Sequence, residues 1–317
     1  MTSPYRNPPW LSRNTGMGSM IRVARSLGVV VPLLRRLFIA GATDQASAKA
    51  FGDYQATEHD VFVTTYTKSG TNWAMQLAVQ IIGRGEAEFE HIHDLVAWPE
   101  AHVSGSVPLD DPGPRRRFST GKRVIKTAIR APFVPYSERA VYLTVLRDPK
   151  DVFVSGYHFF TSLFGLRDHV TPEQWLEMYL SGHAPMGPWP DHAASYWAIR
   201  ERPNVLVVTF AEMKRDLPAV VRKAAEMIGV DLSEAEVERV VERCSFSHMK
   251  ANEEKFAPPR LPFVPEPGTM MRTGKAGVSG ELLTRAQQAR IDRYCIDRLK
   301  QLGSDLPYTE LFDVVEG

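Results

Sequence analysis

The chain has 317 residues, of which 44% are hydrophobic and 24% charged, a composition typical of a folded globular protein. Its 38 basic and 37 acidic residues give a formal net charge of +1, so a nucleic-acid partner is not expected and any anion site must be local. The two cysteines, Cys244 and Cys295, have neither metal-ligand spacing nor a disulfide pattern. We therefore expect no metal site and a reducing, cytoplasmic location.

The first 50 residues are predicted to form an N-terminal arm, residues 1–19, and a basic, apolar helix, residues 20–41, packed on a domain formed by residues 51–317. The longest uncharged run of this helix, SLGVVVPLL, is far below the ~18–20 residues needed to span a bilayer. An alternative is an interfacial helix that makes peripheral membrane contact through its basic and apolar side chains.

After residue 60, apolar strand patterns alternate with helical patterns. The strand patterns are 61–67, 123–129, 140–148 and 204–210. The helical patterns are 71–85, 149–163, 171–182, 190–202, 217–229, 233–244 and 284–303. Together they predict a single α/β domain with a central parallel sheet flanked by helices. Two proline-rich stretches, 108–117 and 256–268, are predicted to be irregular loops that act as lids.

The stretch YTKSGTNW, residues 66–73, joins the first strand to the first helix of this pattern. Strand, small polar loop and helix form the layout of a phosphate cradle, although the Walker spelling is absent. The backbone N–H groups that can point toward an anion are those of Ser69, Gly70, Thr71 and Asn72. Gly70 permits close approach, Lys68 supplies a mobile charge, and Trp73 is flat enough to stack on a base. A capped turn with a surface lysine is the competing interpretation.

The same residues carry a resemblance to a known family. TYTKSGTNW resembles the TYPKSGTTW signature of the cytosolic sulfotransferases, which move a sulfuryl group from 3′-phosphoadenosine 5′-phosphosulfate (PAPS) to a hydroxyl or amine. VYLTVLRDPKDVFVSGYHFF is similar to the second signature of the family. Four further segments match family motifs in chain order: MYLSGHAPMGPWPDHAASYW, VLVVTFAEMKRD, CSFSHMKAN and MMRTGKAGVSG. The six motifs span about residues 52–295 and imply a bacterial member with the P-loop-like sulfotransferase fold.

The resemblance implies where the donor and its product, adenosine 3′,5′-bisphosphate (PAP), would bind. The implied residues are Lys68, Ser69, Gly70, Thr71, Asn72, Trp73, Arg147, Ser155, Phe210, Ser245, Phe246, Met271, Arg272, Thr273 and Gly274. Arg147 and Arg272 can fork onto the oxygens of the 3′-phosphate. Trp73 and Phe246 can sandwich the adenine. For Arg147, an ion pair with Asp148 or Asp151 is the alternative.

One departure from the family pattern concerns the chemistry. The family strand before the second signature ends in K-T-H, and its histidine removes the acceptor proton, whereas this chain reads K-T-A with Ala128 at that position. The resemblance places Lys126 on the transferring sulfonate. Since a general base contributes ~10²–10⁴-fold, we expect a slow enzyme, an acceptor that ionises easily, or another base. The leading substitutes are His158 and Glu100, and an introduced alanine is a further explanation.

The predicted function is PAPS-dependent sulfuryl transfer to an apolar, aromatic, lipid or glycolipid acceptor. This acceptor class rests on aromatic candidates for the pocket wall: Phe89, Trp98, Phe133, Tyr157, Phe159, Phe160, Phe164 and Trp189. The alternative is a PAP- or PAPS-binding protein with little activity, because of Ala128. Of the dimer motif of the family, only Thr284 is retained, so that dimer is not expected.

Overall fold

The computed structural model describes residues 16–100, 106–258, 264, 271, 272, 274 and 276–316, apart from the side chains of residues 16–18 and 41. The predicted arm therefore lies largely outside the described residues, as do Thr273 and most of the predicted loop 256–268. The other predicted loop, 108–117, contains a short helix, α5 (Gly113–Arg117), so it is not wholly irregular.

The described part of the chain contains a five-stranded parallel sheet with the order β2-β3-β1-β4-β5. Its strands are β1 (Asp60–Val63), β2 (Val96–Ala97), β3 (Arg123–Lys126), β4 (Val141–Leu146) and β5 (Val205–Thr209). Every residue of β1, β2 and β4 is buried, as expected for strands covered on both faces. The predicted parallel sheet is confirmed, and the two-residue strand β2 is an addition that the sequence pattern did not indicate.

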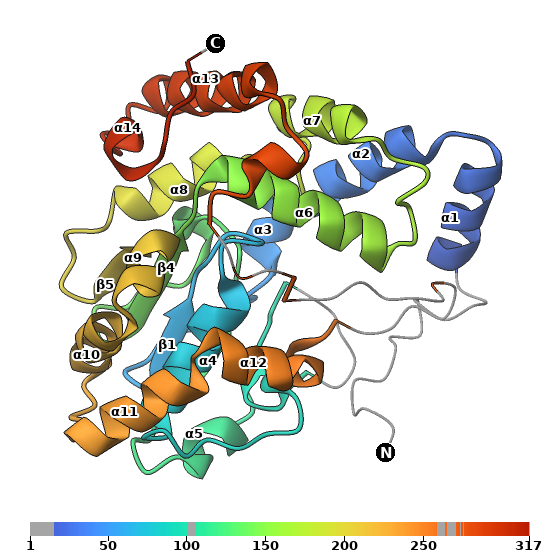
Figure 1. Ribbon diagram of the computed structural model, residues 1–317. Helices are drawn as coiled ribbons and strands as arrows, with labels where there is room; N and C mark the ends of the chain where they lie inside the picture. The colour runs from blue at the N-terminus through green and yellow to red at the C-terminus, as the bar shows by residue number, and fades with distance from the viewer. Residues whose placement is uncertain are drawn as a thin grey trace.

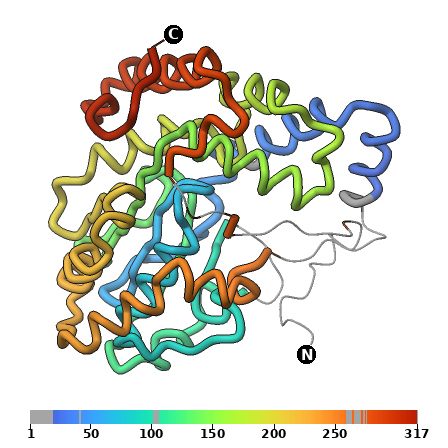
Figure 2. The backbone as a smooth tube through the Cα atoms, viewed as in Figure 1, coloured from blue at the N-terminus to red at the C-terminus, as the bar shows by residue number. Residues whose placement is uncertain are grey.

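Helices cover both faces of the sheet (Figure 1). One layer contains α4 (Thr71–Ile82), α10 (Leu217–Ile228) and α11 (Glu234–Arg243), which share a buried apolar cluster with β1 and β4. The other contains α6 (Pro149–Leu163), α7 (Pro172–Leu180), α8 (Trp189–Trp197) and α13 (Arg285–Gln301). The chain path in Figure 2 shows the C-terminal segment returning over α6 and α8. All seven predicted helical segments are present.

Short elements complete the fold and lie mostly at the edges of these layers. They are α3 (Asp44–Lys49), α9 (Phe210–Arg215), α12 (Phe246–Ala251), α14 (Tyr308–Leu311), η2 (Ile92–Asp94), η3 (Ala131–Phe133), η4 (Glu253–Phe256) and η5 (Ser279–Glu281). Local sequence explains many of the boundaries. At α6, for example, Asp148 accepts a hydrogen bond from the N–H of Lys150, and Pro149 occupies the first helical position.

The predicted helix 20–41 is instead two helices, α1 (Gly16–Ser26) and α2 (Val30–Gly41), because Gly28 has a left-handed backbone with φ of 69°. Ile21 and Leu34 are buried in the cluster formed with α6 and α7, so one face of each helix packs on the domain. Among the described residues, no helix is both long and apolar enough to cross a membrane.

Candidate active site

The loop after β1 turns sharply before α4 begins at Thr71. Lys68 and Gly70 both adopt left-handed backbone conformations, with φ of 63° and 98°. A Cβ atom at Gly70 would lie 3.0 Å from a ring carbon of Phe210, so glycine provides both the conformation and the space. No side chain caps the N-terminus of α4. Its first N–H groups and the positive end of its dipole are therefore available to an anion.

Two buried polar atoms beside this loop are also suited to a ligand. Ser69 Oγ and Trp73 Nε1 are buried, and neither has a hydrogen-bond partner within the described part of the chain. A buried polar atom without a partner costs stability. The two atoms are therefore consistent with a site in which a bound ligand provides the missing hydrogen bonds. Thr71 and Asn72 are half-buried at the start of α4.

Two lysines approach one another at the carboxyl edge of the sheet. Lys126 ends β3, where it pairs with Val63 of β1, and Lys68 follows β1 by five residues. The Lys68 ammonium lies 3.9 Å from the ring centre of Phe159, and that of Lys126 lies 3.0 Å from the ring centre of Trp98. The pKa of each lysine is lowered to about 7, mainly by burial. For Lys68, the positive charges of Arg147 and Lys126 contribute to this lowering. Both ammonium groups are therefore poised to gain from a bound anion.

Arg147 joins the end of β4 to the loop. Its Nη1 donates a hydrogen bond to the backbone carbonyl of Lys68 at 3.0 Å, and its guanidinium lies 4.5 Å from the ring centre of Phe210. Its Nη2 is 3.7 Å from Asp151, so the predicted ion pair is present as a loose contact. Asp151 mainly accepts hydrogen bonds from the N–H groups of Gly277 and Val278. The arginine thus braces the loop while its charge remains at the edge of the site.

The implied residues of the nucleoside side come from α9, α12 and the segment near residue 272. Trp73 and Phe210 pack in a T-shaped arrangement at 5.4 Å between ring centres. Phe246 is 45% exposed and lies beside Gly274, where an added Cβ would be 2.4 Å from its ring. Ser245 caps α12 by accepting from the N–H of His248. These contacts place an exposed aromatic ring next to the segment that contains Arg272.

Arg272 lies on the α6 side of the site. Its Nη1 is 2.5 Å from Glu281 Oε2, and its charge lowers the pKa of Arg147 after the larger effect of burial. Ser155 is half-buried on α6. The N–H of Met271 donates to Glu253 at 2.7 Å, which fixes the backbone beside Arg272. The charge of Arg272 is therefore felt at Arg147.

The two candidate bases lie in different places. Glu100 Oε1 accepts a hydrogen bond from the backbone N–H of Ala128 at 2.7 Å. His158, on α6, has its Nε2 3.9 Å from Glu281 Oε2, and burial together with the charge of Arg272 lowers its pKa. Glu100 is thus beside the position where the sequence predicted a base, whereas His158 is beside Arg272.

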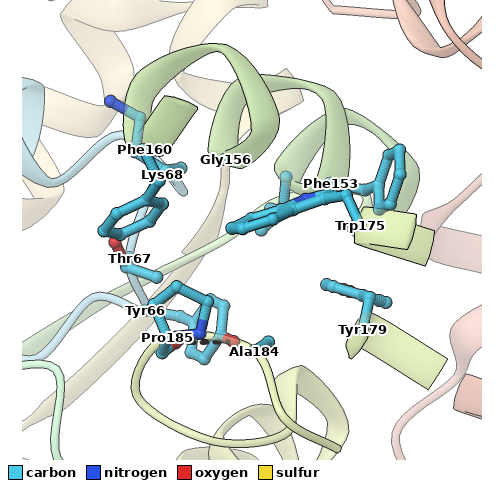
Figure 3. A pocket seen from close by; sticks show the side chains of 11 residues that line it. Tyr66, Thr67, Lys68, Phe153, Gly156, Phe160, Trp175, Tyr179, Ala184 and Pro185 are labelled. Atoms are coloured by element: carbon cyan, nitrogen blue, oxygen red, sulfur yellow. Dashed lines mark hydrogen bonds between the residues drawn. The ribbon is translucent and has the colours of Figure 1, made fainter. Parts of the chain in front are cut away.

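A narrow pocket lies behind the loop, between α6, α7 and the segment 184–185 (Figure 3). Its lining residues are Tyr66, Thr67, Lys68, Val152, Phe153, Gly156, Phe160, Trp175, Tyr179, Ala184 and Pro185. Of the aromatic candidates, only Phe160 lines it. Trp189 is 1% exposed and packs against Tyr308 and Phe312, so it belongs to the core and its proposed place in a pocket wall was wrong.

Sequence reasoning missed Tyr66 and Trp175 as lining residues. Tyr66 directly precedes the loop, and its hydroxyl donates to the carbonyl of Gly187 at 2.6 Å. Its position at the end of the predicted strand could have identified Tyr66 as a lining residue. Trp175 reaches the pocket from α7, about one hundred residues away, and only the packing of α7 on α6 reveals it.

A parallel α/β sheet with a glycine-containing strand–loop–helix and several cations at its carboxyl edge is the arrangement of the P-loop-like class of proteins. The chain belongs to the sulfotransferase domain family, which it matches over residues 58–303. Within the described residues, no group of three or more His, Cys, Asp or Glu is arranged to hold a metal ion.

Curated relatives agree with this assignment. The chain is 26% identical to sulfotransferase 2A1 of Macaca fascicularis over 273 residues, which cover 84% of this chain and 93% of that protein. It is 33% identical to sulfotransferase 2B1 of Mus musculus over 198 residues, 62% of this chain and 57% of that protein.

Solved structures share the fold. Retinol dehydratase in complex with retinol and PAP has a TM-score of 0.67 at 21% identity, covering 83% of this chain and 87% of that one. The same enzyme in complex with androsterone and PAP has a TM-score of 0.68 at 21% identity, covering 84% and 87%.

Proposed function

We propose that this protein transfers a sulfuryl group from PAPS to a hydroxyl or amine of an apolar acceptor. The observation that carries the proposal is the convergence of Lys68, Lys126 and Arg147 on one glycine-containing loop whose helix has no capping side chain. Membership of the sulfotransferase domain family supports it. The PAP named in the complexes of retinol dehydratase supports the same donor here.

Each cation has a distinct role in this proposal. Lys68 neutralises charge that develops on the leaving 5′-phosphate as the S–O bond breaks, and Lys126 holds the sulfonate. Arg147 and Arg272, with Ser155, hold the 3′-phosphate. Such fixed charges at a half-buried site stabilise a transition state without reorganising solvent, which is the main source of catalysis in phosphoryl transfer and, by analogy, in this reaction.

The remaining implied residues surround the nucleoside. The ones assigned to it are Trp73, Phe210, Ser245, Phe246, Met271, Thr273 and Gly274. The N–H groups of Gly70, Thr71 and Asn72 provide donors to the 5′-phosphosulfate. The Ser69 N–H already donates to the carbonyl of Tyr66 at 3.1 Å, so Ser69 provides its hydroxyl instead. Cys244 and Cys295 are both free and buried, which is consistent with the reducing cytoplasm that we propose as the compartment.

The proposed acceptor is an apolar or aromatic alcohol, and a lipid or glycolipid belongs to the same class. The narrow pocket behind the loop is lined mainly by apolar and aromatic side chains and includes Lys68, so the surroundings of the transferring group are apolar, although the pocket itself has room for only about one water molecule. Retinol and androsterone, both named in complexes of retinol dehydratase, are apolar alcohols.

We also propose that α1 and α2 contact an anionic lipid surface from which such an acceptor is taken. Met20 and Val23 of α1 and Leu27, which follows its last residue, form an exposed apolar stripe, which Val29 extends. Residues 16–43 contain four arginines and no acidic residue, so the charge of this face complements anionic headgroups. Phe38 of α2 packs against Phe160 and Trp175, which links this face to the pocket wall.

Turnover of labelled PAPS with a panel of steroid, phenolic and long-chain alcohols tests the function. We expect sulfated product from at least one class. A protein that binds PAP yet forms no product with the panel would be the non-catalytic nucleotide-binding protein that Ala128 suggests as the alternative. PAP should raise the melting temperature much more than ATP with Mg²⁺ at equal concentration. Equal shifts would contradict a site built for the 3′-phosphate.

A further inference from the structure

The short strand β2 brings an acidic side chain to the end of β3. Ala97 pairs with Ile125 in parallel register, and Glu100 and Ala128 each lie three residues beyond this pair. The chain keeps this alignment, because Glu100 Oε1 accepts the hydrogen bond from the Ala128 N–H at 2.7 Å. The carboxylate therefore lies against the backbone of residue 128.

We propose that Glu100 is the general base that removes the proton of the acceptor, replacing a side chain at position 128. This inference rests on the proposed sulfuryl transfer. One carboxylate oxygen remains to accept a proton, because Oε1 is held by Ala128, while Oε2 is buried and makes no hydrogen bond of standard geometry among the described residues, although the nearby Trp98 indole acts on the carboxyl and lowers its pKa. Ala128 is 5% exposed, and its methyl group adds no competing polar atom.

The charges around Glu100 favour this role. Burial raises the pKa of its carboxyl, while the charge of Lys126 and the N–H of Ala128 oppose the rise. Burial raises the pKa of the Tyr196 phenol, on α8, and the negative charge of Glu100 adds to this rise. A carboxyl that is more basic than usual is a better proton acceptor near neutral pH. Lys126, which is proposed to hold the sulfonate, thus lies beside the proposed base.

His158 is less well placed to act as this base. The charges that act on it are those of Arg272, Glu281 and Arg167. Its nearest acidic partner, Glu281, is also the partner of Arg272. These contacts put the imidazole on the side of the site assigned to the 3′-phosphate, whereas Glu100 shares its surroundings with Lys126.

In the proposed step, the acceptor O–H bond breaks and its proton moves to Glu100 Oε2, while the acceptor oxygen forms a bond to sulfur. The bond between sulfur and the bridging oxygen of the 5′-phosphate breaks, and its electron pair stays on that oxygen beside Lys68. The sulfate ester and PAP leave, and Glu100 returns the proton to solvent.

Glu100→Gln tests the proposal because the amide oxygen can still accept from the Ala128 N–H, so the structural contact is kept. Using an alcohol that the wild-type protein sulfates, we expect kcat to fall ~10²–10⁴-fold. The rise of kcat with pH on the acidic side should be lost, and the shift in melting temperature with PAP should be unchanged. Glu100→Asp should lower kcat by a smaller factor. Adding Ala128→His to the Glu100→Gln variant should raise its kcat at least ~10-fold. Glu201→Gln, at an exposed ion pair with Arg200, is the matched control.

The possible failures are distinguishable. If wild-type protein binds PAP but sulfates no alcohol, the proposed function fails, and the base fails with it. If Glu100→Gln turns over within ~5-fold of wild type, or if His158→Ala abolishes the acidic limb, Glu100 is not the base although the transfer stands. If Glu100→Gln and Glu100→Asp both lose the PAP shift, Glu100 is structural and the proposal is overturned.

Discussion

Arg147 holds the loop between β1 and α4 by its backbone: its Nη1 donates to the carbonyl oxygen of Lys68 at 3.0 Å. The same guanidinium lies over the ring of Phe210 and within reach of Asp151. One side chain therefore connects the end of β4 with the loop after β1 and with the aromatic residue beside Gly70. Arg147 therefore contributes both to the backbone conformation of the loop and to the positive charge of the site.

Replacing Arg147 with Ala should weaken PAP binding by ~2–4 kcal/mol, the cost of truncating one partner of a charged hydrogen-bonded pair. Adenosine 5′-phosphosulfate lacks the 3′-phosphate, so its binding free energy should weaken much less. This smaller loss measures how far Arg147 stabilises the loop. Titration calorimetry with both ligands gives the two values. Equal losses would show that Arg147 acts only through Lys68 and does not bind the 3′-phosphate.

PAP affinity should fall as pH rises above about 7. Burial lowers the pKa of Lys68 and of Lys126 to about 7, so both lysines lose their charge as pH rises through that value. A bound anion favours the charged form, so binding above pH 7 must take up protons, and affinity should drop by up to ~10-fold per pH unit for each coupled lysine. Calorimetry in buffers of different ionisation enthalpy measures the uptake. Binding without proton uptake at pH 8 would contradict the assignment of these lysines to the site.

Gly70→Ala should weaken both the fold and the site. An alanine at φ of 98° costs ~1–2 kcal/mol, and its Cβ would lie 3.0 Å from the Phe210 ring. Gly229→Ala is the matched control, because its φ is 77° but no atom lies within 4 Å of an added Cβ. Both variants should melt at lower temperature, and only Gly70→Ala should also lose PAP affinity. If both retain full PAP affinity, close approach at Gly70 is not needed.

The exposed stripe of α1 should bind vesicles that contain phosphatidylglycerol in phosphatidylcholine, and bind pure phosphatidylcholine much less. Leu27→Asp should reduce co-sedimentation, because it places a negative charge on a side chain that is 67% exposed among arginines. High salt should weaken binding, since the attraction acts over about a Debye length.

Leu302→Asp, at a side chain 41% exposed near the end of α13, is the control and should bind as wild type does. Equal binding to both vesicle types would contradict the role of the arginines. Self-association that is lost in Leu27→Asp, without vesicle binding, would assign the stripe to a second copy of the chain.

Local features of the fold and the site followed from the sequence because they depend on neighbouring residues. The apolar runs, the helical spacing and the caps predicted four of the strands and the seven longer helices after β1, whereas α1 and α2 were predicted as one helix. The strand, small polar loop and helix around Gly70 were also predicted, since glycine before a helix permits the left-handed turn that the structure shows there. The anion that this loop would hold stays a prediction. The motif order indicated the family. Ala128 could be recognised as a missing base from the sequence alone.

Tertiary packing decided which distant residues meet. The order β2-β3-β1-β4-β5 places Lys126 beside the loop of Lys68, and no periodicity encodes strand order. β2, too short to leave a pattern, carries Glu100 to Ala128, whereas α6 holds His158 next to the partner of Arg272. The sequence by itself thus determined the elements, the loop around Gly70 and the gap at residue 128. Only the folded chain, through contacts between segments far apart in sequence, brought an acidic side chain to that gap.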